Sequence, residues 1–115
     1  MQYVDLFLAA VPTANKAAYS KHAEAMAVVF KDHGALSVVD VWGDDIPEGE
    51  TNSFHTAVMR KDDETIASGW VVWPDKATRD KGMESMMSDA RMQEEDMPFD
   101  GKRLIFGGFE KIIDL

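Results

Sequence analysis

Apolar residues alternate along the first strand-like stretch of the chain, from Tyr3 to Val11. The alternation places Val4, Leu6, Leu8 and Ala10 on one face and Tyr3, Asp5, Phe7 and Ala9 on the other. Both faces are largely apolar, which is typical of a strand covered on both sides. The stretches from Thr65 to Trp73 and from Leu104 to Ile113 share this two-faced character. We therefore predict three strands that need cover on both faces.

Spacings of three and four residues follow Pro12 and predict a helix from Ala14 to His33 that ends at Gly34. Its inward stripe comprises Tyr19, His22, Ala23, Met26, Val29, Phe30 and His33. A second helix is predicted from Lys76 to about Ser88, with Asp75 as its N-cap. Its inward residues would be Ala77, Met83, Met86, Met87 and Ala90.

Two further β-rich stretches, Leu36 to Trp42 and Phe54 to Arg60, lie between the helices. As separate strands of a meander they would make the strand from Thr65 parallel to the first strand, whereas a ferredoxin-like sheet requires antiparallel neighbours there. We therefore interpret them as one long strand that is interrupted by an excursion from Gly43 to Asn52. The expected fold class is α+β, a ferredoxin-like βαββαβ antiparallel sheet with two helices on one face.

The other face of this sheet needs its own cover, and the sequence offers no third helix for it. We predict that a second copy of the chain supplies the cover. Two identical sheets packed face to face would form a symmetric homodimer with a closed, barrel-like centre. We assign Phe7, together with Tyr3 and Asp5, to this contact between the sheets.

The segment from Met97 to Glu110 is the least generic part of the chain. Pro98 ends any preceding helix, and Asp100-Gly101 is a turn dipeptide before the last strand. Gly107-Gly108 then interrupts that strand, which indicates a bulge, a bend, or close approach of another backbone or a ligand. We favour a bend.

Composition narrows the class of protein. The chain has 115 residues, 45% of them hydrophobic, which fits one domain over residues 1–115. With 21 acidic and 12 basic residues its net charge is −9, so we expect neither nucleic acid nor an acidic membrane surface as a partner. The lack of cysteine excludes disulfides, thiolate metal sites and cysteine nucleophiles. No signal peptide or membrane span is evident, which predicts a cytoplasmic protein.

His22 is the first candidate for chemistry, because it shares the inward helical stripe with Tyr19 and would point toward the sheet. It could act as a general base. The alternative, which we favour, is a neutral buried histidine that hydrogen-bonds to the backbone. No two histidines have metal-binding helical spacing, so we predict no metal site.

Two carboxylates are further catalytic candidates. Asp5 lies inward on a strand covered from both sides, so it must be paired or protonated, and either state shifts the pKa of its carboxyl. We favour a structural ion pair with Lys or Arg over an acid–base role. Asp100 is first a turn former and second a carboxylate at the edge of a pocket.

A family resemblance emerges from motifs spread along nearly the whole chain. They are Tyr3-Val4-Asp5, Val11-Pro12-Thr13-Ala14-Asn15-Lys16, Tyr19-Ser20-Lys21-His22-Ala23-Glu24, Trp42-Gly43-Asp44-Asp45 with Pro47 and Gly49, Trp70-Val71-Val72-Trp73-Pro74, Met97-Pro98-Phe99-Asp100-Gly101-Lys102-Arg103 and Phe106-Gly107-Gly108-Phe109-Glu110. With these the sequence resembles the DUF1428 or YbaA-like family of uncharacterised bacterial proteins, in the dimeric α+β barrel superfamily. The resemblance implies a ferredoxin-like fold and a homodimer, but no substrate. Superfamily relatives include cofactor-free monooxygenases, haem-degrading enzymes and muconolactone-isomerase-like proteins, so the fold alone transfers no function.

We therefore expect a small apolar or aromatic ligand in the groove between helices and sheet, lined by Tyr19, His22, Trp70 and Phe106. Cofactor-free monooxygenase-like or isomerase-like chemistry is the sharpest form of this hypothesis, and we expect no cofactor. The alternative is a non-catalytic structural or protein-interaction dimer. An enzyme would need a convergent polar pair such as His22 with a carboxylate, whereas a binding protein needs only an apolar pocket.

Overall fold

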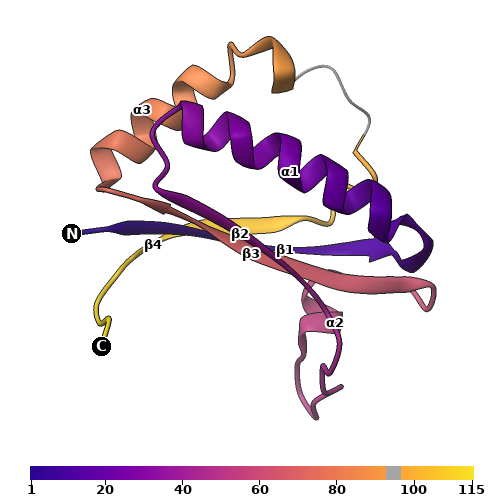
Figure 1. Cartoon of the computed structure of the whole chain (residues 1–115). Helices are drawn as coiled ribbons and strands as arrows, with labels where there is room; N and C mark the ends of the chain where they lie inside the picture. Colours follow the sequence, from indigo (N-terminus) through magenta and orange to yellow (C-terminus); the bar gives the residue numbers. More distant parts are fainter. Residues whose placement is uncertain (93–96) are drawn as a thin grey trace.

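The computed structural model describes residues 1–92 and 97–115 and has an α+β architecture (Figure 1). Its sheet has four antiparallel strands in the order β2-β3-β1-β4. Their bounds are β1 Tyr3–Pro12, β2 Ser37–Trp42, β3 Glu64–Trp73 and β4 Ile105–Glu110. The central pair, β1 and β3, stays in continuous register over the full length of both strands. The predicted central position of the first strand is therefore confirmed.

Two long helices lie on one face of the sheet (Figure 1). The helical elements are η1 Thr13–Asn15, α1 Lys16–Asp32, α2 Phe54–Ala57, α3 Lys76–Met86 and η2 Ala90–Met92. The predicted end of the first helix and the predicted N-cap of the second are confirmed: Gly34, just beyond α1, has φ +111°, and the Asp75 carboxylate accepts from the Thr78 N–H at 2.7 Å. In the described part of the chain, no helix has the length and hydropathy needed to cross a membrane.

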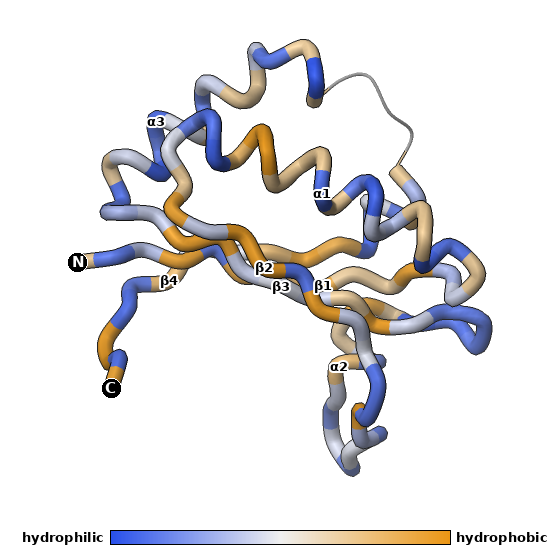
Figure 2. The backbone as a smooth tube through the Cα atoms, in the orientation of Figure 1, coloured by the Kyte–Doolittle hydropathy of each residue, from blue (hydrophilic) through white to orange (hydrophobic). Residues whose placement is uncertain are grey.

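The core forms where the helices meet the sheet. One cluster joins Ala9, Val11 and Ala67 of the sheet to Tyr19 of α1. A second cluster centres on Trp73, which is fully buried. Figure 2 shows that the strongest hydrophobic runs lie in the strands, whereas α1 and α3 alternate hydrophobic with hydrophilic residues. This division fits helices that each turn one side toward the sheet.

The predicted strand from Phe54 to Arg60 is wrong, because its first residues form the short helix α2. The Ser53 hydroxyl accepts from the Thr56 N–H at 3.1 Å, and the Thr56 hydroxyl accepts from the Ser53 N–H at 3.0 Å. This reciprocal pair is a capping box, and it satisfies backbone donors that a strand would have paired with a neighbour. The interrupted long strand is therefore absent. β2 pairs directly with β3, and the chain between them leaves the sheet as an excursion on the face opposite α1 (Figure 1).

The predicted inward side of the second helix is also partly wrong. Met86 and Gly82 are buried, but Ala77 and Ala90 are exposed and Met87 is 77% exposed. Because α3 ends at Met86, the helical spacing carried no information beyond it. A Cβ atom on Gly82 would lie 2.7 Å from the Trp73 ring, so the absence of a side chain there permits close packing.

The assignment of Phe7, Tyr3 and Asp5 to the face away from the helices is wrong. Asp5 contacts Arg79 of α3, and Tyr3 packs with the Trp73 cluster beneath the helices. The other face of β1 carries Leu6, which is 41% exposed. Alternation separated the two faces correctly but gave no sign of which one the helices cover.

The glycine pair in β4 forms no bulge, because the pairing of β1 with β4 is continuous from Leu8 and Ile105 to Tyr3 and Glu110. Gly108 instead lies against the Tyr3 ring, where a Cβ atom would come within 2.6 Å of Cε2. The glycine therefore makes room for a side chain of the neighbouring strand.

Candidate functional site

A pocket of about 280 Å³ lies where α1 packs against the edge strand β2. Its walls come from one side of α1 and the adjoining part of β2. They comprise Tyr19, Ser20, Ala23, Glu24, Ala27, Val38, Asp40, Val41 and Trp42. The pocket therefore combines two aromatic rings with two carboxylates in an otherwise small or apolar lining.

Tyr19 and Asp40 form the polar centre of this pocket. The Tyr19 hydroxyl donates to Asp40 Oδ1 at 2.8 Å. Tyr19 is held in place because its ring is only 5% exposed and packs with Ala9, Val11 and Ala67. Asp40 pairs with Gly69 of β3, whose missing side chain leaves room for the neighbouring Phe7 ring.

The surroundings of this pair shift both pKa values upward. Burial raises the pKa of the Asp40 carboxyl, while the Tyr19 hydrogen bond and the charge of His22 act in the opposite direction. Burial also raises the pKa of the Tyr19 hydroxyl, and the bond to Asp40 adds to the rise. Tyr19 therefore stays a hydrogen-bond donor at neutral pH, and Asp40 is a carboxylate whose protonation is easier than in water.

His22 lies next to this pair but lines a different pocket. That pocket, of about 220 Å³, also includes Met26, Arg91 and Met97. The His22 ring packs edge-on against Phe99, with ring centroids 6.1 Å apart. The charge of His22 also acts on Asp40, where it opposes the rise in the pKa of the carboxyl.

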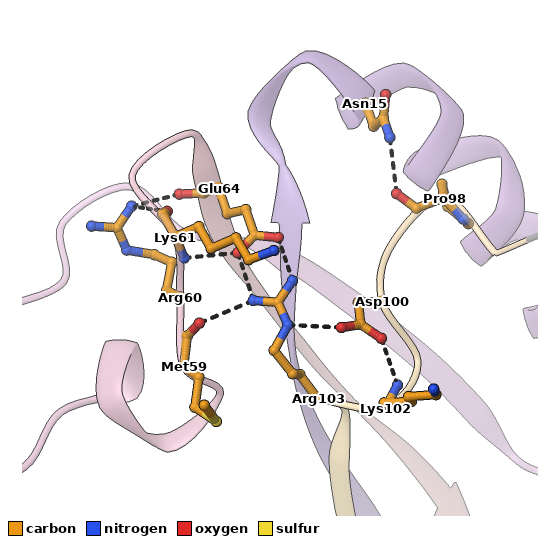
Figure 3. A network of polar contacts seen from close by, with 9 residues as sticks. All are labelled: Asn15, Met59, Arg60, Lys61, Glu64, Pro98, Asp100, Lys102 and Arg103. Atoms are coloured by element: carbon orange, nitrogen blue, oxygen red, sulfur yellow. Dashed lines mark hydrogen bonds and ion pairs between the residues drawn. The ribbon is translucent and has the colours of Figure 1, made fainter.

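Trp42 and Phe99 enclose Tyr19 from two sides. Each ring centroid lies 5.8 Å from that of Tyr19, in a tilted arrangement. Phe99 comes from the segment before β4, which Asn15 holds through a 3.0 Å hydrogen bond from Nδ2 to the Pro98 carbonyl (Figure 3). The segment that begins at Met97 therefore contributes Phe99 to the packing around Tyr19, although it does not line the pocket itself.

A network around Arg103 fixes the other end of this segment (Figure 3). The guanidinium donates to both carboxylate oxygens of buried Glu64, to Asp100 and to the Met59 carbonyl. Asp100 also accepts from the Lys102 N–H at 3.0 Å. These contacts bear out the role of Asp100 as a turn former and place it in the network rather than at the α1–β2 pocket.

Asp5 makes the ion pair that we favoured. Its carboxylate accepts from Arg79 at 2.8 and 3.1 Å and from the Trp73 indole N–H at 2.9 Å. Arg79 also lies over the Tyr3 ring, 5.3 Å from its centroid. Every one of these partners is structural, so Asp5 lies within the core and outside the α1–β2 pocket.

The four predicted ligand-binding residues do not converge. Tyr19 lies between α1 and the sheet, and His22 lines the separate pocket with Met26, Arg91 and Met97. Trp70 and Phe106 line a hollow of about 370 Å³ that also includes Leu6, Leu8 and Ile105. These last three residues belong to the face that the helices leave open. Among the described residues there is also no group of three or more His, Asp or Glu placed to hold a metal ion.

Sequence reasoning missed Asp40 and the role of Trp42. The available signal was a lone carboxylate in the strand Ser37–Trp42, which otherwise consists of apolar residues and one serine. A charged residue at such a position needs a partner, and the nearest inward hydroxyl on the predicted helix belongs to Tyr19.

Comparisons with known proteins place this arrangement in a family. The model of the family described as "Protein of unknown function (DUF1428)" matches residues 2–101. The uncharacterised protein YbaA of Escherichia coli (strain K12) is 47% identical over 116 residues, which cover 99% of each chain. The uncharacterised protein YbaA of Shigella flexneri is similar to the same extent.

Proposed function

We propose, since the chain belongs to the DUF1428 family of proteins of unknown function, that it binds a small organic molecule in the pocket between α1 and β2. The apolar or aromatic part of the ligand would lie against Trp42 and Tyr19. Its polar group would face Asp40. The Tyr19–Asp40 pair carries this proposal, because burying part of a carboxylate costs stability, and titratable groups perturbed in this way cluster at functional sites.

The dimensions of the pocket favour a compact ligand. Its volume of about 280 Å³ is close to the lower end of the range for small-molecule sites, roughly 300–1,000 Å³. A lining of apolar groups with a few convergent polar ones is also usual for such sites. A single-ring compound fits these dimensions better than an extended one.

The pair would also allow proton transfer without a cofactor. A carboxylate with a raised pKa can take a proton from a bound molecule and return it, while the Tyr19 hydroxyl holds the carboxylate in place. Isomerase-like chemistry would need no more than this. Monooxygenase-like chemistry is the other form of the hypothesis, and it would use the same pocket.

The uncovered sheet face supports a ferredoxin-like protomer in a homodimer, a dimeric α+β barrel. Without the short helix α2, the element order is βαββαβ, as in ferredoxin-like folds. The open face carries Leu6, Trp70, Ile105 and Phe109, which are 39–53% exposed. A second copy packed on this face would bury four such side chains from each protomer. The same face favours the alternative function, a non-catalytic interaction dimer.

The three tryptophans allow a direct test of the ligand site. Trp42 lines the pocket, Trp70 lies on the open face and Trp73 is buried in the core. Small aromatic and carbonyl compounds would be screened by thermal shift, and hits would be titrated while the indole N–H signals are followed by NMR. Each signal would be assigned with a Trp→Phe variant.

A ligand of the proposed site should raise the melting temperature in a concentration-dependent way and shift the Trp42 signal first. Tyr19→Phe and Asp40→Asn should each weaken it about tenfold, the loss of one good polar contact. Ser88→Ala, on exposed chain beyond α3, is the matched control. Hits that shift only Trp70, or a broad screen without any binder, would contradict the proposal and favour the interaction dimer.

A further inference from the structure

We infer that the ligand of the α1–β2 pocket is a small organic cation, an amine whose ammonium group faces Asp40 and whose body lies against Trp42. This inference rests on the proposed function of the same pocket and adds the chemical class of the ligand.

The charge of the lining gives the first argument. Asp40 and Glu24 both line the pocket, and none of its lining residues in the described chain is Lys, Arg or His. The whole chain carries a net charge of −9, which favours the approach of cations and opposes that of anions. An anionic ligand would therefore meet like charge both at a distance and inside the pocket.

The aromatic walls give the second argument. The Trp42 ring stands at 50° to that of the buried Tyr19, with centroids 5.8 Å apart, so Trp42 is the aromatic wall that a ligand can reach. The faces of such rings attract ammonium groups. Lys16 already places its ammonium group 5.8 Å from the centroid of the Trp42 ring. This ring therefore already contacts a cation in the folded protein, and a bound ammonium group would take the place of Lys16 there.

The hydrogen bonding of Asp40 favours a cationic ligand over a neutral one. Tyr19 donates to Oδ1, and within residues 1–92 and 97–115 no other side chain or backbone group donates to the carboxylate. Oδ2 can therefore accept from a ligand. A neutral alcohol or amide could donate to this oxygen, but it would leave the charge of the partly buried carboxylate uncompensated, which is unfavourable. An ammonium group supplies both the charge and the donors.

The test uses three probes that share one ring and differ in charge: benzylamine, benzyl alcohol and benzoate. Each is titrated into the full-length protein at pH 7 and low salt, with the Trp42 indole N–H signal as the readout. We expect benzylamine to bind at least tenfold more tightly than benzyl alcohol and benzoate to cause no shift.

Two variants of the pocket and one control variant distinguish specific binding in the pocket from general electrostatic attraction to an acidic protein. Asp40→Asn keeps the shape of the side chain and should reduce benzylamine affinity to that of benzyl alcohol. Glu24→Gln, at the exposed rim, should give a smaller loss of about two- to threefold. Glu84→Gln removes the same charge from the exposed side of α3 and should leave the affinity unchanged.

The outcomes distinguish the inference from the proposed function. Equal binding of benzylamine and benzyl alcohol at Trp42 would overturn the inference that the ligand is a cation, but the pocket would remain a ligand site. An equal loss in Asp40→Asn and Glu84→Gln would also overturn it, because attraction would then be non-specific. If no probe shifts Trp42, and the wider screen also finds no binder there, both the inference and the proposed function fail.

Discussion

Arg103 donates hydrogen bonds to both carboxylate oxygens of Glu64, with Nη1 2.7 Å from Oε1 and Nη2 2.6 Å from Oε2. The two side chains are only 14% and 5% exposed, so the pair is largely removed from water. It connects the start of β3 to the segment that leads into β4, 39 residues further along the chain. A two-pronged contact in such surroundings is among the stronger polar interactions in proteins.

The first prediction concerns pH. Arg103 lowers the pKa of Glu64 from 4.5 to about 2. Because the folded pKa lies below the ordinary one, ionised Glu64 stabilises the fold above pH ~4.5, and this contribution is lost as the pH falls toward ~2. The loss should amount to about 3 kcal/mol. Urea unfolding between pH 2 and 7 should show a flatter profile for Glu64→Gln than for the wild type.

Asp62→Asn is the control for this experiment, since Asp62 is exposed and lies close by in the chain. Its profile should follow that of the wild type. A Glu64→Gln profile as steep as the wild-type one would show that other carboxylates govern acid unfolding.

The second prediction concerns the buried ion pair of Asp5 and Arg79. Asp5→Asn can still accept from the Trp73 indole but leaves the Arg79 charge poorly compensated, so the free energy of unfolding should fall by roughly 2–3 kcal/mol. Asp80→Asn removes the other, exposed carboxylate that contacts Arg79 and should lower the free energy of unfolding far less. Equal losses in the two variants, measured by urea unfolding, would contradict the structural role of Asp5.

The third prediction concerns the open sheet face. Leu6→Asp would place a charge in the proposed contact between two sheets and should raise the dimer dissociation constant more than a hundredfold, by about 3 kcal/mol. Val28→Asp, at a 52% exposed position of α1, should leave the dimer intact. Analytical ultracentrifugation checks both. A wild-type protein that sediments as a monomer at micromolar concentration would end the dimer hypothesis.

The fourth prediction concerns Asp40. Its raised pKa means that the folded state holds a proton more tightly than the unfolded state, so ionised Asp40 weakens the fold at neutral pH. Asp40→Asn should therefore be more stable than the wild type at pH 7, although it weakens ligand binding. The difference should shrink as the pH falls and the wild-type carboxyl takes up its proton. Thermal unfolding at several pH values measures this, and a variant that is less stable at pH 7 would contradict it.

The four observed strands, the two long helices, the end of α1 and the start of α3 could be predicted from the sequence, because each depends on the preferences of neighbouring residues. Asp75 begins α3 and Gly34 follows α1, as their side-chain and backbone preferences require. The helix α2 was not accessible, because its capping box uses Thr56 where Glu or Gln is usual, and its residues also suit a strand.

Only half of the candidate site could be predicted from the sequence. Tyr19 was identified from its place on the helical stripe, but its partner Asp40 belongs to β2, and their contact depends on how the helix lies on the sheet. The same limit explains Trp70. Its aromatic character marked it as a ligand-binding candidate, but which face of the sheet the helices cover is decided by packing between distant segments. Phe106 instead lies opposite Phe7 on the edge strand β4 and is 70% exposed.

Two contacts of the segment before β4 also control access of solvent to the Tyr19 ring. Asn15 holds Pro98, and Arg103 holds the following turn to Glu64, so both contacts keep Phe99 against Tyr19. Release of this stretch leaves β1, β2 and β3 paired, but it requires loss of the Arg103–Glu64 pair. Local opening of this kind still costs less than global unfolding. Exposure of the Tyr19 ring is therefore coupled to the strength of that ion pair, and amide hydrogen exchange at residues 99–103 would report how often it occurs.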